Sequence, residues 1–103
     1  MTVVSFTQVA TNDLAVIKNA LALKSGKRVA LKYANRFYDL FERLTEHPSS
    51  CPARPRLGYG VRMGVVAPYL VFYHYDNHEK LVTVMRVVHG KRRITRKMLL
   101  SDS

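Results

Sequence analysis

The stretch from Val61 to His89 decides the fold: VRMGVVAPYLVFYHYDNHEKLVTVMRVVH. Its β-branched and aromatic residues follow a period of two, which is the pattern of half-buried strands. Ala67-Pro68 interrupts the pattern once and Asp76 to Glu79 interrupts it again, and both segments carry residues that favour turns. We therefore predict three consecutive strands that pair antiparallel through two tight turns. These strands cover residues 61–66, 69–75 and 81–89.

Two amphipathic helices precede these strands. Thr11-Asn12-Asp13 offers N-cap side chains, and apolar residues then recur on one helical face from Leu14 to Leu21. Ser25-Gly26 ends this helix, because glycine accepts the left-handed conformation that is common at helix C-termini. A second helix is predicted from Lys27 to Glu46, where apolar residues again recur at three- and four-residue spacing. With so short a connection the two helices form an antiparallel hairpin.

A short strand from Thr2 to Thr7 completes the element order β-α-α-β-β-β. This order predicts an α+β fold, with a mostly antiparallel sheet and the helical hairpin packed on one of its faces. We expect residues 1–103 to form a single domain, because a chain of this length suits one core.

The predicted turns also fix which side chains share a face of the sheet. A two-residue turn at Ala67-Pro68 and a four-residue turn at Asp76 to Glu79 divide the strand residues into two sets. The first set mixes arginines and tyrosines with valines, and comprises Arg62, Tyr69, Val71, Tyr73, Val82, Val84 and Arg86. The second set is apolar, and comprises Met63, Val65, Leu70, Phe72, Met85 and Val87. We expect the helices to cover the second set and to leave the first as an open, cationic face.

The chain carries a net charge of +10, with 17 lysines and arginines against 7 acidic residues. Residues 1–51 contribute +3, from seven cations and four anions, and residues 52–103 contribute +7, from ten cations and three anions. This excess predicts an anionic partner, either a nucleic acid or an acidic protein, more than a membrane surface. The single cysteine, Cys51, allows no intrachain disulfide, and residues 1–10 lack the pattern of a signal peptide, so we expect a cytoplasmic protein.

Three motifs in the second half resemble a known family. Arg62 lies in VRMGVV, the next strand reads PYLVFY from Pro68 to Tyr73, and the last strand closes with RVVHGKRR from Arg86 to Arg93. Together with the element order, they resemble the RelE/ParE superfamily of bacterial toxins from type II toxin–antitoxin systems. The HGKRR ending is more similar to the ParE branch.

The resemblance implies a growth-inhibiting toxin that acts on DNA gyrase, contributes to plasmid stabilisation, needs no cofactor or metal, and is held in a hetero-oligomer by an acidic antitoxin. Its implied target-binding residues are Arg62, Arg86, His89, Lys91, Arg92, Arg93, Arg96 and Lys97. The antitoxin is expected on Tyr69, Val71, Tyr73, Val82, Val84 and Arg86. Grooves beside the helical hairpin also suit such a segment.

Two alternatives remain open. RelE-like members are ribosome-dependent mRNA endoribonucleases, which need cations for the phosphate charge together with an acid and a base. Arg62 and Arg86 would supply the cations and His89 the proton transfer, although a histidine before glycine often serves only as a structural hydrogen-bonding group. The second alternative is a non-toxic nucleic-acid-binding module that stacks bases on Tyr69 and Tyr73.

Overall fold

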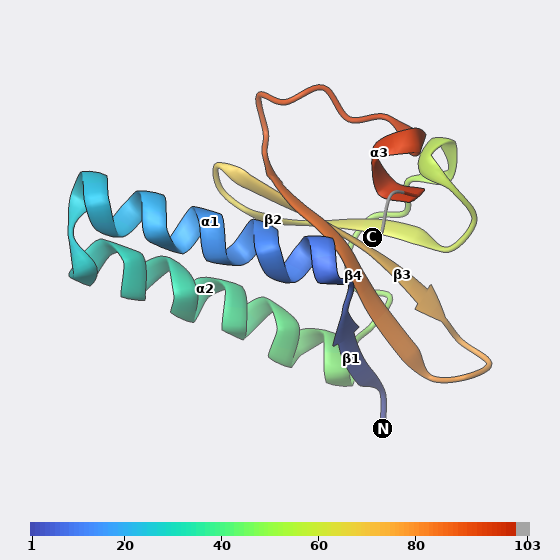
Figure 1. The fold of residues 1–103 in the computed structure, drawn as a ribbon. Helices are drawn as coiled ribbons and strands as arrows, with labels where there is room; N and C mark the ends of the chain where they lie inside the picture. Colours follow the sequence, from blue (N-terminus) through green and yellow to red (C-terminus); the bar gives the residue numbers. More distant parts are fainter. Residues whose placement is uncertain (101–103) are drawn as a thin grey trace.

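The computed structural model describes residues 1–100, and Figure 1 shows their arrangement. The elements are β1 (Val3–Phe6), α1 (Gln8–Ser25), α2 (Lys27–Glu46), the single 3₁₀ turn η1 (Pro55–Leu57), β2 (Val61–Val66), β3 (Tyr69–Asp76), β4 (Leu81–His89) and α3 (Arg96–Leu100). The predicted order of strands and long helices is confirmed. The short elements η1 and α3 were not predicted.

The four strands form one sheet in the order β1-β4-β3-β2. β1 pairs parallel with β4, whereas β4 with β3 and β3 with β2 pair antiparallel. The predicted α+β fold with a mostly antiparallel sheet is therefore confirmed. The hairpin of α1 and α2 lies against the sheet at one end and projects beyond it at the other (Figure 1).

The first helix begins earlier than predicted. Its N-cap is Thr7, whose Oγ1 accepts a hydrogen bond from the backbone N–H of Ala10 at 3.0 Å, so Thr11-Asn12-Asp13 lies inside the helix. The same Oγ1 donates to the carbonyl of Met85 at 3.0 Å. One threonine thus starts α1 and satisfies a carbonyl on the edge of β4 just beyond the end of β1. At the other end, Gly26 has a φ of 91° and joins α1 directly to α2, as predicted.

The pairing of β2 with β3 is confirmed, including Arg62 opposite Tyr73, but the predicted pairing of β3 with β4 is wrong. Asp76 stays in the strand, because its Oδ1 accepts the N–H groups of His78 and Glu79 and so places the turn at residues 77–80. Tyr73 therefore faces Val84 rather than Val82. A bulge next to this pair shifts the register again, and Tyr69 faces His89 rather than Arg86.

The assignment of the two sheet faces to helix and solvent is also wrong. The valines and tyrosines of the first set lie under the hairpin, and Val71, Tyr73, Val82 and Val84 are each 0% exposed. Their partners on α2 are Phe37, Leu40 and Leu44. Turn geometry sets which residues share a face, but it does not determine which face receives the helices. The bulge also turns Val87 to the hairpin side, away from the rest of its predicted set.

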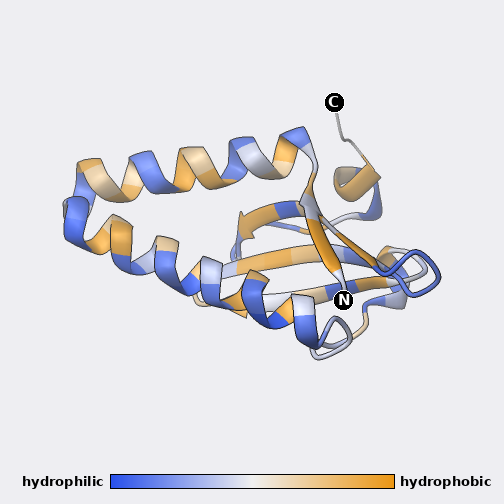
Figure 2. Ribbon diagram, turned by 90° about the horizontal axis from the view of Figure 1, so that it is seen from below, coloured by the Kyte–Doolittle hydropathy of each residue, from blue (hydrophilic) through white to orange (hydrophobic). Residues whose placement is uncertain are grey.

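The opposite face of the sheet carries a second, smaller apolar cluster. Val61, Phe72 and Val88 pack there against Leu99 of α3, which is 3% exposed. In Figure 2 the strands are mostly hydrophobic in colour, whereas each long helix alternates between the two colours, as expected for strands buried between two layers. The C-terminal segment thus covers part of the sheet face that the sequence had assigned to the helical hairpin.

Candidate target-binding and antitoxin-binding surfaces

Arg86 is not on the open face predicted for it, because its guanidinium is mostly buried and paired. Its side chain is 10% exposed, and its Nε and Nη2 donate to the carboxylate of Asp13 at 2.7 and 3.1 Å. The bulge turns this side chain toward α1, away from Phe72 across the ladder. The same carboxylate accepts the N–H of Val87 at 3.0 Å. Arg86 therefore holds α1 to the edge of β4, and Asp13 neutralises its charge.

Arg62 also serves the fold. Its Nη1 donates to the carbonyls of Cys51 and Ser49 at 2.7 and 3.1 Å, and so closes the loop that follows α2. Tyr73 binds the same loop, because its hydroxyl donates to the carbonyl of Pro48 at 2.8 Å. Burial and its neighbour Cys51 raise the pKa of Tyr73 far above that of a free phenol. The two arginines expected on one open face are thus both engaged by the chain's own groups.

His89 lies at the exposed end of β4, as predicted. Its Nδ1 accepts the backbone N–H of Lys91 at 3.1 Å, and its ring packs edge-on against Tyr69 with centroids 5.8 Å apart. The ring thereby closes the turn at Gly90. This arrangement agrees with the structural alternative that the sequence left open for this residue.

The remaining predicted target-binding residues do form an exposed surface. Lys91, Arg92 and Arg93 lie on the connection after β4, and Arg96 and Lys97 lie on α3; all five are exposed. A shallow depression of about 400 Å³ between them is lined by Arg86, Arg92, Arg93, Thr95, Lys97 and Met98. None of these lining residues is a carboxylate, a histidine or a tyrosine. The surface is thus suited to binding an anion.

The residues predicted to bind the antitoxin are not available for direct contact. Tyr69, half-buried against the core, is the most accessible of them, and the hairpin covers Val71, Tyr73, Val82 and Val84. Because these side chains build the main core, a partner reaches them only if α1 and α2 leave the sheet. Their open placement is therefore wrong for the same reason as the face assignment.

An apolar groove between α1 and α2 is accessible instead. It has a volume of about 240 Å³ and is lined by Leu14, Ile17, Lys18, Leu21, Ala30, Tyr33, Ala34, Phe37, Tyr38 and Phe41. Exposed Leu31 and Tyr38, at 61% and 63%, lie on the same helix, α2. We refer to this feature as the hairpin groove. Its sequence signal is the apolar spacing along α1, since Leu14, Ile17 and Leu21 line the groove.

Within residues 1–100, no helix is long and apolar enough to cross a membrane, and no group of three or more His, Cys, Asp or Glu side chains is placed to hold a metal ion.

A helical hairpin packed on a four-stranded mixed sheet is the architecture of toxins of the RelE/ParE class. The family model described as the ParE toxin of the type II toxin–antitoxin system parDE matches residues 4–94. The chain therefore belongs to the ParE toxin family. The predicted superfamily, and the preference for its ParE branch, are confirmed.

Two solved structures show the same fold. The chromosomal ParDE toxin–antitoxin system from P. aeruginosa aligns with a TM-score of 0.71 and 21% sequence identity, over 86% of this chain and 96% of that one. The RelBE2 toxin–antitoxin complex from Mycobacterium tuberculosis aligns with a TM-score of 0.60 and 26% identity, over 85% of this chain and 96% of that one. A search of curated proteins gave no match.

Proposed function

We propose that this toxin inhibits DNA gyrase by binding, and that it acts in the cytoplasm, where gyrase works on DNA. The observation that carries the proposal is the exposed cationic segment from Lys91 to Lys97, whose depression contains no acid–base pair. Membership in the ParE family supports gyrase as the target. A role in plasmid stabilisation follows from the same proposal.

Cleavage of mRNA is the less favoured alternative. Metal-free cleavage needs cations that are free to bind the reacting phosphate, together with a positioned acid and base. Arg86 is paired with Asp13, Arg62 is bound to loop carbonyls, and the Nδ1 of His89 accepts a backbone N–H. Asp102, the one acidic residue that follows His89 in the sequence, lies outside the described residues.

The hairpin groove is our candidate for the antitoxin site. Its apolar lining matches an amphipathic helix, which would insert hydrophobic side chains between α1 and α2. The net charge of +10 favours an acidic partner. Both similar structures are toxin–antitoxin systems, which supports a cognate antitoxin and a hetero-oligomeric complex for this chain as well.

The test of the gyrase proposal is a pair of assays on the purified chain: supercoiling by gyrase, and integrity of a message translated on ribosomes. We expect supercoiling to be inhibited and the message to remain intact. The double variant Arg92→Gln/Arg93→Gln should inhibit supercoiling at least about tenfold less, because each arginine contact to an anionic target contributes of the order of 1 kcal/mol and about 1.4 kcal/mol corresponds to a factor of ten. Lys24→Gln/Lys27→Gln at the hairpin tip removes the same charge far from the segment and should inhibit as the wild type does. Cut mRNA with unaffected supercoiling would contradict the proposal.

A further inference from the structure

Cations from two distant parts of the sequence meet on the α3 side of the sheet. The 3₁₀ turn η1 lies beside α3, where Leu57 packs against the cluster that holds Leu99 (Figure 1). This brings exposed Arg54 and Arg56 to the side of the molecule that presents the C-terminal cations. No pattern in the sequence groups these arginines with the C-terminal segment.

We propose that these residues form one composite surface that binds the phosphate backbone of double-stranded DNA. The surface, here named the basic patch, comprises Arg54, Arg56, Arg92, Arg93, Arg96 and Lys97. The inference deepens the proposed function, since a toxin that inhibits gyrase would then contact the DNA that gyrase holds. The binding itself is a property of this chain and needs no gyrase.

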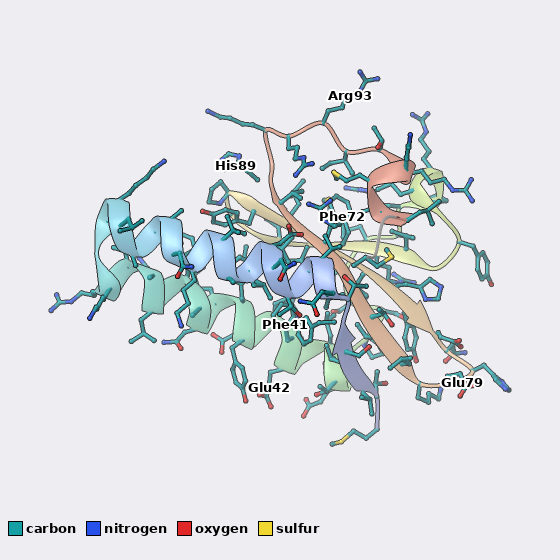
Figure 3. The ribbon with its side chains drawn as sticks, in the orientation of Figure 1. Phe41, Glu42, Phe72, Glu79, His89 and Arg93 are labelled. Carbon is teal, nitrogen blue, oxygen red and sulfur yellow. The ribbon has the colours of Figure 1, made fainter. Side chains whose placement is uncertain are left out.

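The basic patch is electrostatically uncompensated among residues 1–100. The only salt bridge in that range joins Arg86 to Asp13 and involves no residue of the patch. The other described acidic residues lie on α2, at the end of β3 or in the turn between β3 and β4. Figure 3 shows Arg93 on the opposite side of the molecule from Glu42 and Glu79. This separation of charge directs the positive end of the molecule toward an anion.

The chemistry of the basic patch favours phosphate over a protein surface. Five of its six residues are arginines, whose planar guanidinium groups bind phosphate oxygens in pairs. Protein interfaces are anchored by buried apolar or aromatic residues, whereas the depression between Arg92, Arg93 and Lys97 has a single apolar lining residue, Met98. Lining of this kind positions a charged backbone and has no pocket for a hydrophobic anchor.

A duplex fits better than a single strand. Single-stranded nucleic acids bind through aromatic residues on which bases stack. Tyr73 under the hairpin and Phe72 under α3 are 0% and 1% exposed and are not available for stacking. Tyr69 and Tyr75 are half-buried against the main core, and exposed Tyr59 after η1 is a single ring rather than a row of stacking platforms. A regular backbone with its closely spaced phosphates needs only cations held at fixed positions.

The backbone segments that carry the cations of the basic patch are held at fixed positions. Leu99 anchors α3 in the second apolar cluster, and Thr95 Oγ1 accepts the N–H of Met98 at 3.2 Å at the start of the helix. On the other segment, Arg54 donates its backbone N–H to the carbonyl of Val61 at 2.8 Å. The backbones that carry the patch are therefore fastened to the sheet before any ligand arrives, which lowers the entropy lost on binding.

The test is fluorescence anisotropy of a labelled duplex of about 20 base pairs and arbitrary sequence, titrated with the purified chain from about 50 to about 200 mM salt. We expect the logarithm of the association constant to fall steeply and linearly with the logarithm of salt concentration. Arg54→Gln/Arg56→Gln and Arg92→Gln/Arg93→Gln should each weaken binding about tenfold and reduce the slope by about 2 units, since each lost phosphate contact accounts for about 0.9. Lys24→Gln/Lys27→Gln should change the affinity by less than about twofold.

Several results would overturn the inference. One is an effect of the hairpin-tip variant equal to that of the patch variants, which would mean that only net charge matters. Another is wild-type affinity for Arg54→Gln/Arg56→Gln, which would remove η1 from the surface. Equal or tighter binding of single-stranded RNA, or of polyglutamate, would exclude a duplex as the preferred ligand. The anisotropy assay contains no gyrase, so it tests the basic patch separately from the proposed function. A chain that binds the duplex but does not inhibit supercoiling would count against the proposed function alone. A chain that inhibits supercoiling but does not bind the duplex would count against the basic patch alone.

Discussion

At the scale of single residues, Asp13 illustrates how one side chain joins elements that are distant in the sequence. Its carboxylate accepts two hydrogen bonds from Arg86 and one from the backbone of Val87, within 2.7 to 3.1 Å. The first of these contacts spans 73 positions of the chain. Beyond Phe6, where β1 stops, Thr7 and Asp13 together satisfy the exposed edge of β4.

Replacing Asp13 should therefore be strongly destabilising. Asp13→Ala leaves the buried guanidinium of Arg86 without its anion, a change that typically reduces the free energy of unfolding by about 3 kcal/mol or more. The measurement is urea denaturation followed by circular dichroism. Asp39→Ala is the matched control, because Asp39 is exposed and forms no salt bridge in the described chain, and it should stay within about 0.5 kcal/mol of wild type. Equal stability of the two variants would show that the pair contributes nothing.

Tyr73 predicts a specific dependence on pH. Its pKa is raised by burial, so the folded state holds the phenolic proton more tightly than the unfolded state, whose tyrosine titrates near 10. The stabilisation is fully present below about pH 10 and is lost above it, by up to about 1.4 kcal/mol per pH unit. Tyr73→Phe removes the hydrogen bond to Pro48, which costs about 1 kcal/mol of stability at neutral pH. Because phenylalanine does not titrate, this variant does not lose further stability at alkaline pH.

The stability gap between wild type and Tyr73→Phe should thus close as pH rises past about 10. Urea denaturation at a series of pH values from neutral to alkaline measures it. Tyr59→Phe, at a position that is 97% exposed, should follow the wild type throughout. A gap that stays constant into the alkaline range would mean that Tyr73 does not retain its proton in the fold.

The sequence indicated the types of these residues better than their partners. Thr11-Asn12-Asp13 has the composition of an N-cap, and local propensity alone favours that reading. The cap is Thr7, because β1 ends at once and the helix begins directly after it. Asp13 was thereby freed to pair with Arg86, a contact between residues 73 positions apart that no local pattern predicts. The same long-range pairing neutralises Arg86, which the sequence predicted to be free on an open face.

At the scale of elements, long periodic segments were predicted correctly and short ones were missed. The second helix and the boundaries of β2 and β4 agree with the sequence, because each has many residues in one consistent period. The register of β3 with β4 failed, since the Asp76 side chain repositions the turn and a bulge adds a residue. α3 has only five residues, and its apolar anchors are visible only once the sheet is present to receive them.

The packing of α3 yields a paired prediction. Leu99→Ala leaves a cavity against Val61, Phe72 and Val88 and should reduce the free energy of unfolding by about 2 kcal/mol or more. It should also loosen α3, so that trypsin cuts faster among the cations from Arg92 to Lys97. Leu100→Ala, one residue along and 68% exposed, should alter neither stability nor the digestion rate.

Tryptic digestion under native conditions, followed by mass spectrometry, measures the rate of cutting for each variant. If Leu100→Ala accelerates digestion as much as Leu99→Ala does, the anchoring of α3 by Leu99 is contradicted. Because the basic patch depends on α3, Leu99→Ala should also weaken binding of the duplex.

At the scale of the whole molecule, the sheet separates two surfaces of different character. The hairpin groove is apolar and lies on the side of α1 and α2, whereas the basic patch is cationic and lies on the side of α3. The sequence predicted a single open face that was both apolar and cationic, whereas the apolar groove and the exposed cations lie on different sides. Charge and hydropathy are properties of composition and survive errors in register, while the side on which they appear depends on how the helices pack.

This separation predicts that binding of antitoxin and binding of DNA can be lost independently. Leu21→Gln places a polar group in the hairpin groove while keeping a good helix former, and should weaken binding of the cognate antitoxin about tenfold or more. Binding of the duplex should be unchanged, because Leu21 lies on the other side of the sheet. Leu23→Gln, at a position on the same helix that is 88% exposed and does not line the groove, is the control and should leave both affinities at wild type.

The complementary variant Arg92→Gln/Arg93→Gln should lose duplex binding. Its affinity for the antitoxin should change only as much as that of Lys24→Gln/Lys27→Gln, which lowers the net charge by the same amount. Isothermal titration calorimetry with the full-length antitoxin and anisotropy with the duplex give both affinities for the wild type and for each variant. If Leu21→Gln instead weakens both ligands, or Leu23→Gln matches it, the surfaces are not separate and the antitoxin does not occupy the groove. If only the arginine variant weakens the antitoxin, the acidic partner covers the basic patch directly, and neutralisation is then steric exclusion of DNA.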